Sequence, residues 1–286
     1  WRPTLYRAIK GLKRVLVRSR VSNHHSMVFT SSEAVLSDAT VVFAFDSHGA
    51  FSVLQSSVHD TWLRQFASTM RNDIRYTPVR CFRTFPFPPG WESKSALESA
   101  GREYYEYRAS LMVRNGEGLT KTYNRFHDPS ETSSGLMELR RLHGEMDQAL
   151  LAAYGWSDVP TACRFGLDYL DLEDDAQLPD ALQERIDSGE LFFWDANDAL
   201  DFQGQLQAYG AITGRRKLPW RYRWPESVRD DVLARRLVLN AYRYAKDVAM
   251  VMKGRLRVSA TTTSRASAPL ANFHVSDAEA QIGLAH

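Results

Sequence analysis

A short segment near the amino end gathers side chains that can read nucleic acid. Arg18 and Arg20 are separated by one residue, and Asn23 and His24 follow shortly afterwards. Arginine can pair with guanine through two hydrogen bonds, and asparagine can pair with adenine in the same way. The segment therefore predicts contacts to base edges or to a groove of DNA.

A second segment has a similar composition. Residues 71–77 follow a helix-forming stretch and combine Arg71, Asn72, Arg75 and Tyr76 with small hydroxyl side chains. A loop of this kind can reach base edges in a groove, whereas nearby basic residues contact phosphates and hold the register. Each segment alone is also compatible with a structural role, since an asparagine side chain at a turn often forms hydrogen bonds to nearby backbone groups. The candidates for phosphate contact are Arg7, Lys10, Lys13 and Arg14.

Other chemistry has weaker support. His24 and His25 are adjacent, so regular structure does not easily direct both towards one metal ion. His143 with Glu145, and the acidic run at residues 173–175, are better explained as solvated surface. The sequence contains no G-x-x-x-x-G-K-[ST], G-x-G-x-x-G, G-x-S-x-G or H-E-x-x-H motif. It therefore predicts neither a catalytic site nor a metal site.

Charge is distributed unevenly along the chain. Residues 1–90 hold twelve Lys or Arg against five Asp or Glu, whereas residues 158–201 hold thirteen acids against two arginines. A basic segment attracts a polyanion and an acidic one repels it. We expect the first third to face DNA and the acidic part to lie away from it, although a solvated face of mixed charge is an alternative.

Composition is that of a folded, water-soluble protein. The chain has 286 residues, of which 44% are hydrophobic and 24% charged, with 16 Gly and 11 Pro. It has only Cys81 and Cys163 to pair, no apolar run of about 18 residues, and no basic-then-apolar start. We expect a cytoplasmic protein with reduced cysteines and no membrane segment.

The elements that hold the first candidate residues are mixed. Helical spacing after Pro3 predicts a short basic helix, with Arg7, Lys10 and Arg14 on one face. Residues 15–22 favour a strand from which Arg18 and Arg20 project side by side. Further strands are predicted at residues 27–30 and 40–45, and a helix at residues 50–67.

The pattern becomes helical beyond residues 85–90, where three prolines interrupt regular structure. Helices are predicted from a capping box at Ser95 and Glu98, from Leu136 to Tyr154 with Gly155 as its end, and from Ser227 onwards. Residues 157–225 are predicted to be irregular, with several possible short helices. The resulting fold class is α+β: a small mixed α/β domain (1–90), a helical domain (91–257) and a poorly ordered tail (258–286).

The order of several segments resembles one family. Residues 16–24, 58–62, 75–77 and 81–88 resemble the target-recognition region of MmeI-like type II restriction-modification enzymes. Residues 119–124, 147–156 and 221–240 resemble the C-terminal helical segment of the same proteins. These enzymes are single-chain adenine-specific DNA methyltransferases fused to an endonuclease.

The resemblance implies a function and also a missing part. Family members bind S-adenosylmethionine through a glycine-rich motif and methylate adenine N6 through an Asn-Pro-Pro-aromatic motif, and the sequence has neither. The chain is therefore expected to be a C-terminal part that recognises a DNA sequence for restriction-modification or phage defence. Its implied partners are double-stranded DNA and its own N-terminal methyltransferase domain, which would bind the cofactor; residues 92–250 would serve as a scaffold.

Two other functions remain open at this point. A protein-interaction module would use the basic helix and the aromatic residues Tyr104, Tyr105 and Tyr107 to bind a partner instead of DNA. A hydrolase with an unrecognised site is a further alternative, so whether the chain is an enzyme is not decided. For the DNA interpretation the candidate contacts are Arg7, Lys10, Lys13, Arg14, Arg18, Arg20, Asn23, His24, Arg71, Asn72, Arg75 and Tyr76.

Overall fold

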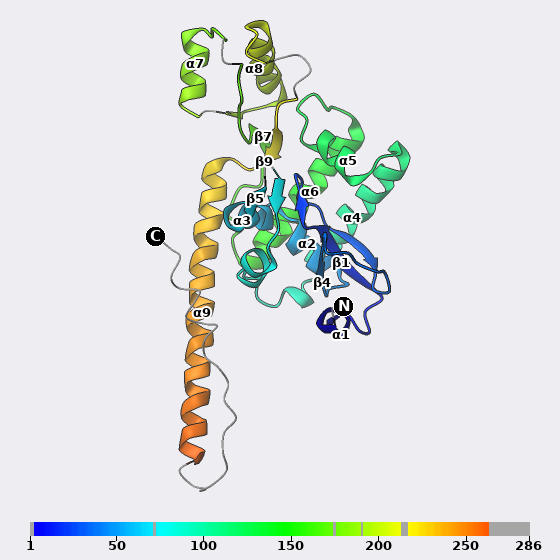
Figure 1. The fold of residues 1–286 in the computed structure, drawn as a ribbon, viewed down its shortest axis with the longest axis vertical. Coiled ribbons are helices and arrows are strands. Elements are labelled where there is room, and N and C mark those ends of the chain that lie inside the picture. Colours follow the sequence, from blue (N-terminus) through cyan, green and yellow to red (C-terminus); the bar gives the residue numbers. More distant parts are fainter. Residues whose placement is uncertain (1–2, 71–72, 174–175, 190, 213–216, 263–286) are drawn as a thin grey trace. The chain divides into compact units, whose positions relative to one another are not determined.

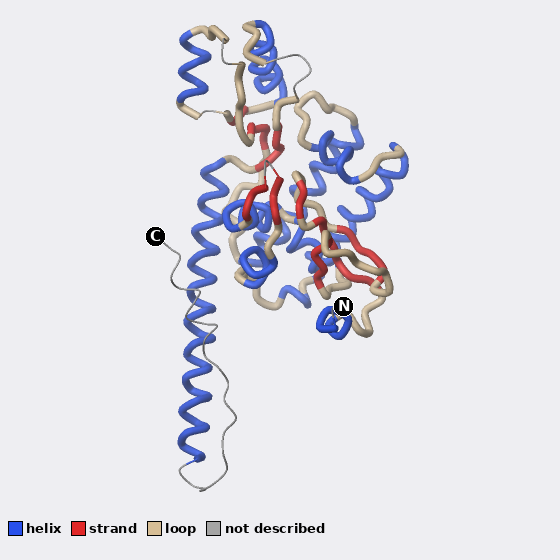
Figure 2. The backbone as a smooth tube through the Cα atoms, viewed as in Figure 1, coloured by secondary structure: helices blue, strands red, loops and turns tan. Residues whose placement is uncertain are grey.

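The computed structural model describes residues 3–70, 73–173, 176–189, 191–212 and 217–262 (Figure 1). Backbone contacts separate a compact unit that extends to Asn240 from a second unit that begins at Ala241. Helices predominate, and small antiparallel sheets lie between them along the chain (Figure 2). The fold class is therefore α+β, as the sequence predicts.

The first sheet is built on β1 (Arg14–Ser19), which lies between β3 (Val28–Ser31) and β4 (Thr40–Phe43). Both neighbours are antiparallel to β1. Alternating side chains of β1 cover the two faces of the sheet: Val15 and Val17 pack with Ile9, whereas Leu16 belongs to the main core. The short helix α1 (Pro3–Ala8) precedes Ile9, as predicted.

The second sheet contains β2 (Val21–Ser22), β6 (Asp73–Arg75) and β5 (Ser68–Met70), with β6 in the centre. The prediction of one strand over residues 15–22 is wrong, because the strand divides at Arg20. The backbone N–H of Arg20 donates to the carbonyl of Ala39 at 2.7 Å, and its carbonyl accepts from Tyr76 N–H at 2.8 Å. Arg20 is thus the point where the chain passes from one sheet to the other.

The predicted helix at residues 50–67 is two helices, α2 (His48–Gln55) and α3 (Ser57–Phe66). Ser56 separates them with an extended backbone (ψ 161°). Its hydroxyl accepts from the N–H of His59 at 3.2 Å and donates to the carbonyl of Val53 at 2.9 Å. A serine that caps a helix in this way favours an interruption over a continuous helix.

The proline-containing residues 85–90 form no helix or strand, as predicted, and lie between the short helices η1 (Val79–Arg83) and η2 (Trp91–Ser93). One buried hydrophobic cluster nevertheless spans both sides of this segment, since it includes Leu16 and Phe51 together with Tyr104 and Leu139. Residues 1–90 and the helices that follow therefore share a core, and the division into two domains at residue 90 stays a prediction.

Three helices follow: α4 (Ser95–Asn115), α5 (Leu119–Phe126) and α6 (Ser134–Tyr154). Gly155 ends α6 with a φ of 80°, which the sequence predicts. The capping box at Ser95 and Glu98 is wrong. Glu98 instead accepts from the backbone N–H of Gly49 at 2.7 Å, which links α4 to the start of α2.

A third sheet, which the sequence does not predict, lies in the region expected to be irregular. Its strands are β7 (Arg164–Leu167), β8 (Phe192–Phe193) and β9 (Trp220–Arg223), with β7 in the centre. Two further helices, α7 (Asp180–Asp187) and α8 (Ala196–Ala208), belong to the same region. Phe193, Phe202 and Trp220 build a separate small core beneath them.

The last described element is α9 (Glu226–Thr262), which confirms the predicted helix after Ser227. Residues 258–262, which were assigned to the tail, are part of α9, and residues 263–286 lie outside the described residues. Within the described chain, no helix combines the length and the apolar character needed to cross a lipid bilayer.

Candidate nucleic-acid interface

The basic residues of the first fourteen positions do not share one helix face. Arg7 belongs to α1, whereas Lys10 and Lys13 lie in the turn that follows, and all three are exposed. Arg14 opens β1, so its predicted place on the helix is wrong. Its guanidinium lies 3.8 Å from the ring centre of Phe29 and donates to the carbonyl of Asp46 at 2.9 Å. Arg7, Lys10 and Lys13 thus remain open to a phosphate.

Arg18 and Arg20 differ in their surroundings, and the prediction that they project side by side is wrong. Arg18 is buried, donates to Nδ1 of His25 at 2.8 Å and lies 4.7 Å above the ring of Tyr76. Burial lowers the pKa of Arg18 to about 10. Arg20 is half-buried and donates to the carbonyl of Asp38 at 2.8 Å. In this arrangement Arg18 is a core residue and only Arg20 reaches the surface.

His24 is also an interior residue. Its Nε2 donates to the side-chain oxygen of Asn124 at 2.8 Å, and its ring stacks on His127 with 5.4 Å between ring centres. Burial, reinforced by the charge of Arg221, lowers the pKa of His24 to about 4. The imidazole is therefore neutral near pH 7 and lies in a stack of rings, away from solvent.

The second predicted segment contributes one exposed residue to the described surface. Arg75 is exposed on β6, beside Val21 of β2. Tyr76 is buried, and its hydroxyl lies 3.1 Å from Nε2 of His59. Arg71 and Asn72 lie outside the described residues.

Asn23 is held in place by a contact to a distant part of the chain. It is exposed, directly follows β2, and is held by a residue almost two hundred positions later. Arg221 of β9 donates to the side-chain oxygen of Asn23, and also to its carbonyl at 3.2 Å. The same guanidinium donates to Asp168 at 2.7 Å. The third sheet therefore fixes the position of Asn23.

Four arginines that the sequence analysis missed gather next to Asn23. They come from three regions of the chain, since Arg64 is on α3, Arg221 and Arg223 are on β9, and Arg229 is on α9. They line a hollow of about 360 Å³ together with Asn23 and Asp168. We call this the arginine hollow. The alternation of Arg221 and Arg223 along one strand was a usable signal, because residues two apart point to the same face.

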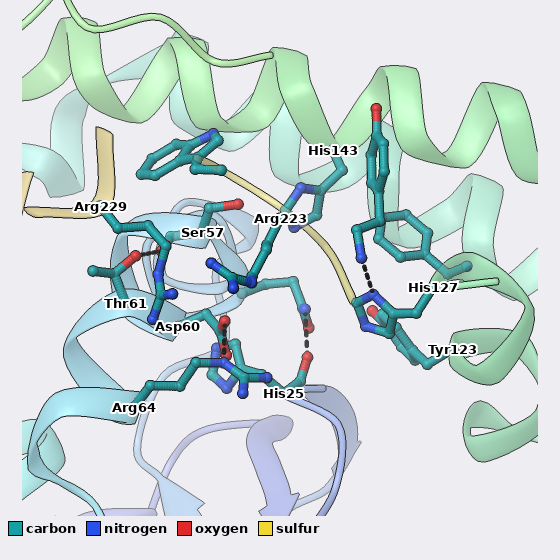
Figure 3. Close-up of a pocket in the computed structure, with 14 residues that line it drawn as sticks. His25, Ser57, Asp60, Thr61, Arg64, Tyr123, His127, His143, Arg223 and Arg229 are labelled. Atoms are coloured by element: carbon teal, nitrogen blue, oxygen red, sulfur yellow. Dashed lines mark hydrogen bonds and ion pairs between the residues drawn. The ribbon is translucent and has the colours of Figure 1, made fainter. Parts of the chain in front are cut away.

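A second hollow of about 440 Å³ adjoins the arginine hollow, because Asn23 and Arg221 line both. Beneath them lies a smaller cavity of about 40 Å³, around which Asp60, Arg64, Arg223 and Arg229 gather with His127 and His143 (Figure 3). The guanidinium of Arg64 donates to Asp60 at 2.8 Å and lies 3.5 Å from Asp168. Arg64 lowers the pKa of the Asp60 carboxyl against the effect of its burial.

The predicted absence of a metal site remains a prediction. Among the described residues, no three His, Cys, Asp or Glu side chains gather closely enough to hold a metal ion. Asp174 and Asp175, which form most of the acidic run, lie outside those residues.

The tyrosines named for a protein-binding function belong to the interior. Tyr104 is buried, and its hydroxyl lies 3.0 Å from that of Tyr123. Tyr105 also contacts the core, since its hydroxyl accepts from the N–H of Phe29 at 3.2 Å. The hydroxyl of Tyr107 donates to the carbonyl of Gly135 at 3.2 Å. These residues pack α4 and do not form an exposed aromatic face.

Antiparallel sheets thus contribute arginines to a basic hollow beside Asn23. Residues 3–89 match the family model described as the target recognition domain of MmeI. This part of the chain is therefore a target recognition domain of the MmeI type.

Two individual proteins show similarity over longer parts of the chain. DNA methyltransferase A of Bacillus subtilis (strain 168) is 26% identical over 129 residues, which is 45% of this chain and 13% of that protein. The type IIL restriction-modification enzyme MmeI, solved in complex with DNA, is 18% identical with a TM-score of 0.41, over 68% of this chain and 22% of that one. The chain thus spans a small fraction of the length of each.

Proposed function

We propose that this chain recognises a specific DNA sequence for an adenine N6 methyltransferase that is carried by another part of the same protein. The observation that carries the proposal is the match of residues 3–89 to a target recognition domain. The similar DNA methyltransferase A supports methylation as the reaction being directed. Restriction-modification or phage defence in the cytoplasm is the setting that fits such a pair of activities.

A duplex-modifying enzyme needs such a module for a physical reason. A methyltransferase must flip its target base out of the stack, so a separate surface has to hold the duplex in register and select the site. In this proposal the methyltransferase part binds S-adenosylmethionine, and the present residues supply only recognition. Its partners are then double-stranded DNA and the methyltransferase domain.

Accessibility divides the twelve candidate residues into groups. Arg7, Lys10 and Lys13 are exposed and suit phosphate contacts, whereas Asn23 and Arg75 are exposed at the second sheet and suit contacts to bases. Arg14 and Arg20 reach the surface in part, while Arg18, His24 and Tyr76 support these positions from inside. We therefore assign sequence reading to Asn23 and Arg75 first.

The test is selection from a pool of duplexes with randomised sequence, using the 286-residue chain. We expect enrichment of one motif, and a loss of preference at one position of that motif in each of Asn23→Ala and Arg75→Ala. Losing a base contact should cost about 1–3 kcal/mol at that position. Arg141→Ala is the control, because Arg141 is exposed on α6 and paired there with Glu138 and Glu145.

The outcome that would refute the proposal is equally direct. If the chain enriches no sequence, or if both variants select the motif of the unaltered chain with the same stringency, then residues 3–89 do not read DNA in the proposed way.

A further inference from the structure

We infer that the arginine hollow binds a phosphate of the DNA backbone, so that β9 and the start of α9 help to hold the duplex beside Asn23. This inference rests on the proposed function, because DNA must be the ligand of the adjoining recognition domain. It gives residues 92–250, expected to serve as a scaffold, a direct part in binding DNA.

The first support is unequal neutralisation of the four guanidinium groups. Arg64 and Arg221 are satisfied by carboxylates, since Asp168 lies 3.5 Å from Arg64 and 2.7 Å from Arg221, and Asp60 lies 2.8 Å from Arg64. Among the described residues, Arg229 forms an ion pair with Glu226 at 3.9 Å, and the side chain of Glu226 is 76% exposed. Among the described residues Arg223 makes no ion pair, although Asp168 and Glu226 lie near enough to act on its charge, so Arg223 and Arg229 are less fully neutralised than Arg64 and Arg221.

The second support is that part of the Arg223 guanidinium is buried without a hydrogen bond to any described residue. Its Nε and Nη1 atoms are buried and have no hydrogen-bond partner within the described part of the chain. A buried guanidinium without an acceptor is costly, so a turn of this side chain towards a phosphate in the hollow that it lines would be favourable. Burial and the nearby charge of Arg229 also lower the pKa of Arg223 to about 10.

The third support is the shape and position of the hollow. A volume of about 360 Å³ can admit a phosphate group, and arginine forks match phosphate oxygens with two parallel hydrogen bonds. Asn23 lines the same hollow, and a residue that reads a base needs the neighbouring DNA backbone to be held in place. Phosphate contact here would set the register of Asn23 on the duplex.

The acidic residues that face the hollow should oppose the binding of a phosphate. Asp168 is engaged by Arg221 and Arg64, but Glu226 competes with a phosphate for Arg229. Removing the negative charge in Glu226→Gln should therefore tighten duplex binding, whereas Arg229→Gln should weaken it. A role for Arg229 confined to the helix would not produce opposite effects on DNA affinity.

The experiment measures duplex affinity by fluorescence anisotropy between 50 and 200 mM KCl. We expect Arg229→Gln and Arg223→Gln to weaken binding about 5–10-fold at 100 mM salt, alike for selected and unrelated duplexes, and to reduce the salt slope by about 1. Glu226→Gln should tighten binding about 2–5-fold, as expected from a lost charge close to one phosphate. Arg223→Lys keeps the charge and shows whether a loss in Arg223→Gln reflects the fold or the phosphate contact.

The controls carry the same change of charge away from the hollow. Arg235→Gln matches Arg229→Gln on the same helix, because Arg235 is paired with Asp158 and Asp231. Glu103→Gln matches Glu226→Gln, because Glu103 is exposed on α4. Both controls should leave duplex affinity within about twofold, since screening suppresses distant charges.

The outcomes separate this inference from the proposed function. If the chain enriches no sequence but Arg229→Gln still weakens salt-dependent duplex binding, the recognition proposal fails and the phosphate site stands. If the chain selects a motif while the Arg223 and Arg229 variants match their controls, the phosphate site is refuted alone. A loss confined to one sequence position would indicate a base contact, and stabilisation by inorganic phosphate without any effect on duplex affinity would indicate a small-anion site; either result overturns the inference.

Discussion

Helices α2 and α4 approach each other closely at Gly101, which leaves no room there for a larger side chain. A Cβ atom added at Gly101 of α4 would lie 2.2 Å from the carbonyl oxygen of His48 and 2.3 Å from the hydroxyl of Ser52, both on α2. The carbonyl belongs to the backbone and cannot rotate away. Gly101→Ala therefore has to push α4 from α2 by roughly 1 Å, which is overpacking of the core.

The cost follows from what that displacement strains. Overpacking costs about 1–3 kcal/mol. Separation of the helices also weakens the hydrogen bonds from Ser52 to the carbonyl of Leu97 at 2.6 Å and from Gly49 N–H to Glu98 at 2.7 Å. Each such bond contributes about 1 kcal/mol, and the gain in helix propensity from Gly to Ala returns about 1 kcal/mol. We expect the free energy of unfolding to fall by about 2–4 kcal/mol.

Urea unfolding followed by circular dichroism measures this loss, and Gly144→Ala is the matched control. Gly144 is also inside a helix, α6, but an added Cβ would meet nothing within 4 Å. That variant should gain about 0.5–1 kcal/mol from helix propensity alone. If Gly101→Ala is as stable as Gly144→Ala, then α2 and α4 do not cross as closely as described and the shared core is wrong.

Three other predictions address buried polar groups. Arg108 is buried and donates to the carbonyl of Met27 at 2.7 Å and to the hydroxyl of Tyr123 at 2.8 Å. Arg108→Met leaves these buried acceptors unpaired and should lower the free energy of unfolding by about 3–5 kcal/mol. A loss below about 1 kcal/mol in urea unfolding would contradict that role. Ser56→Ala removes the cap of α3 and should cost about 1–2 kcal/mol in the same measurement, whereas no change would mean that the hydroxyl is not needed to separate the helices. Burial lowers the pKa of four imidazoles below that of the unfolded chain, to about 4 in His24 and about 3 in His25, and also in His59 and His127. The folded protein therefore holds them neutral, and the stability that depends on this is complete above about pH 6.5 and is lost as the pH falls below it. Four such groups should reduce the unfolding free energy by about 5 kcal/mol between pH 7.5 and 5.5, and a flat profile from urea titrations over that range would show that they are not buried and neutral.

Local periodicity predicts the long helices well. In α6, Leu136, Leu139, Met146 and Leu150 recur at helical spacing and are buried, and Gly155 ends the helix in the left-handed conformation. These features depend on neighbouring residues alone. The same is true of the strands β3 and β4, although not of how they pair.

Features that depend on distant residues could not be predicted in this way. The division of the first strand at Arg20 is set by hydrogen bonds to Ala39 and Tyr76, which no local pattern contains. The third sheet joins β7 to β8 and β9 from distant parts of the chain, and no local pattern contains these pairings.

The candidate site was predicted in part for the same reason. The exposed position of Asn23 follows from its place directly after a strand, whereas Arg75, which was expected in a loop, lies on β6, the central strand of the second sheet. The burial of Arg18 does not follow in this way, because it requires His25 as an acceptor and the ring of Tyr76 as a neighbour. Arg64 and Arg229 meet beside Asn23 only through the tertiary fold, so no segment of the sequence identifies their cluster.

The contact between Arg221 and Asn23 has a consequence for how sequence is read. The side-chain oxygen of Asn23 already accepts from Arg221, so the amide N–H groups are the part of this side chain that remains available to a ligand. A donor selects base edges that present acceptors, such as N7 and O6 of guanine or O4 of thymine, and reduces the advantage of the two-bond pairing with adenine. If Asn23 reads a base as proposed, its choice of base therefore depends on β9 as well as on residues 3–89. Transferring residues 3–89 to another protein without its partner at position 221 would release the oxygen of Asn23 and alter that choice.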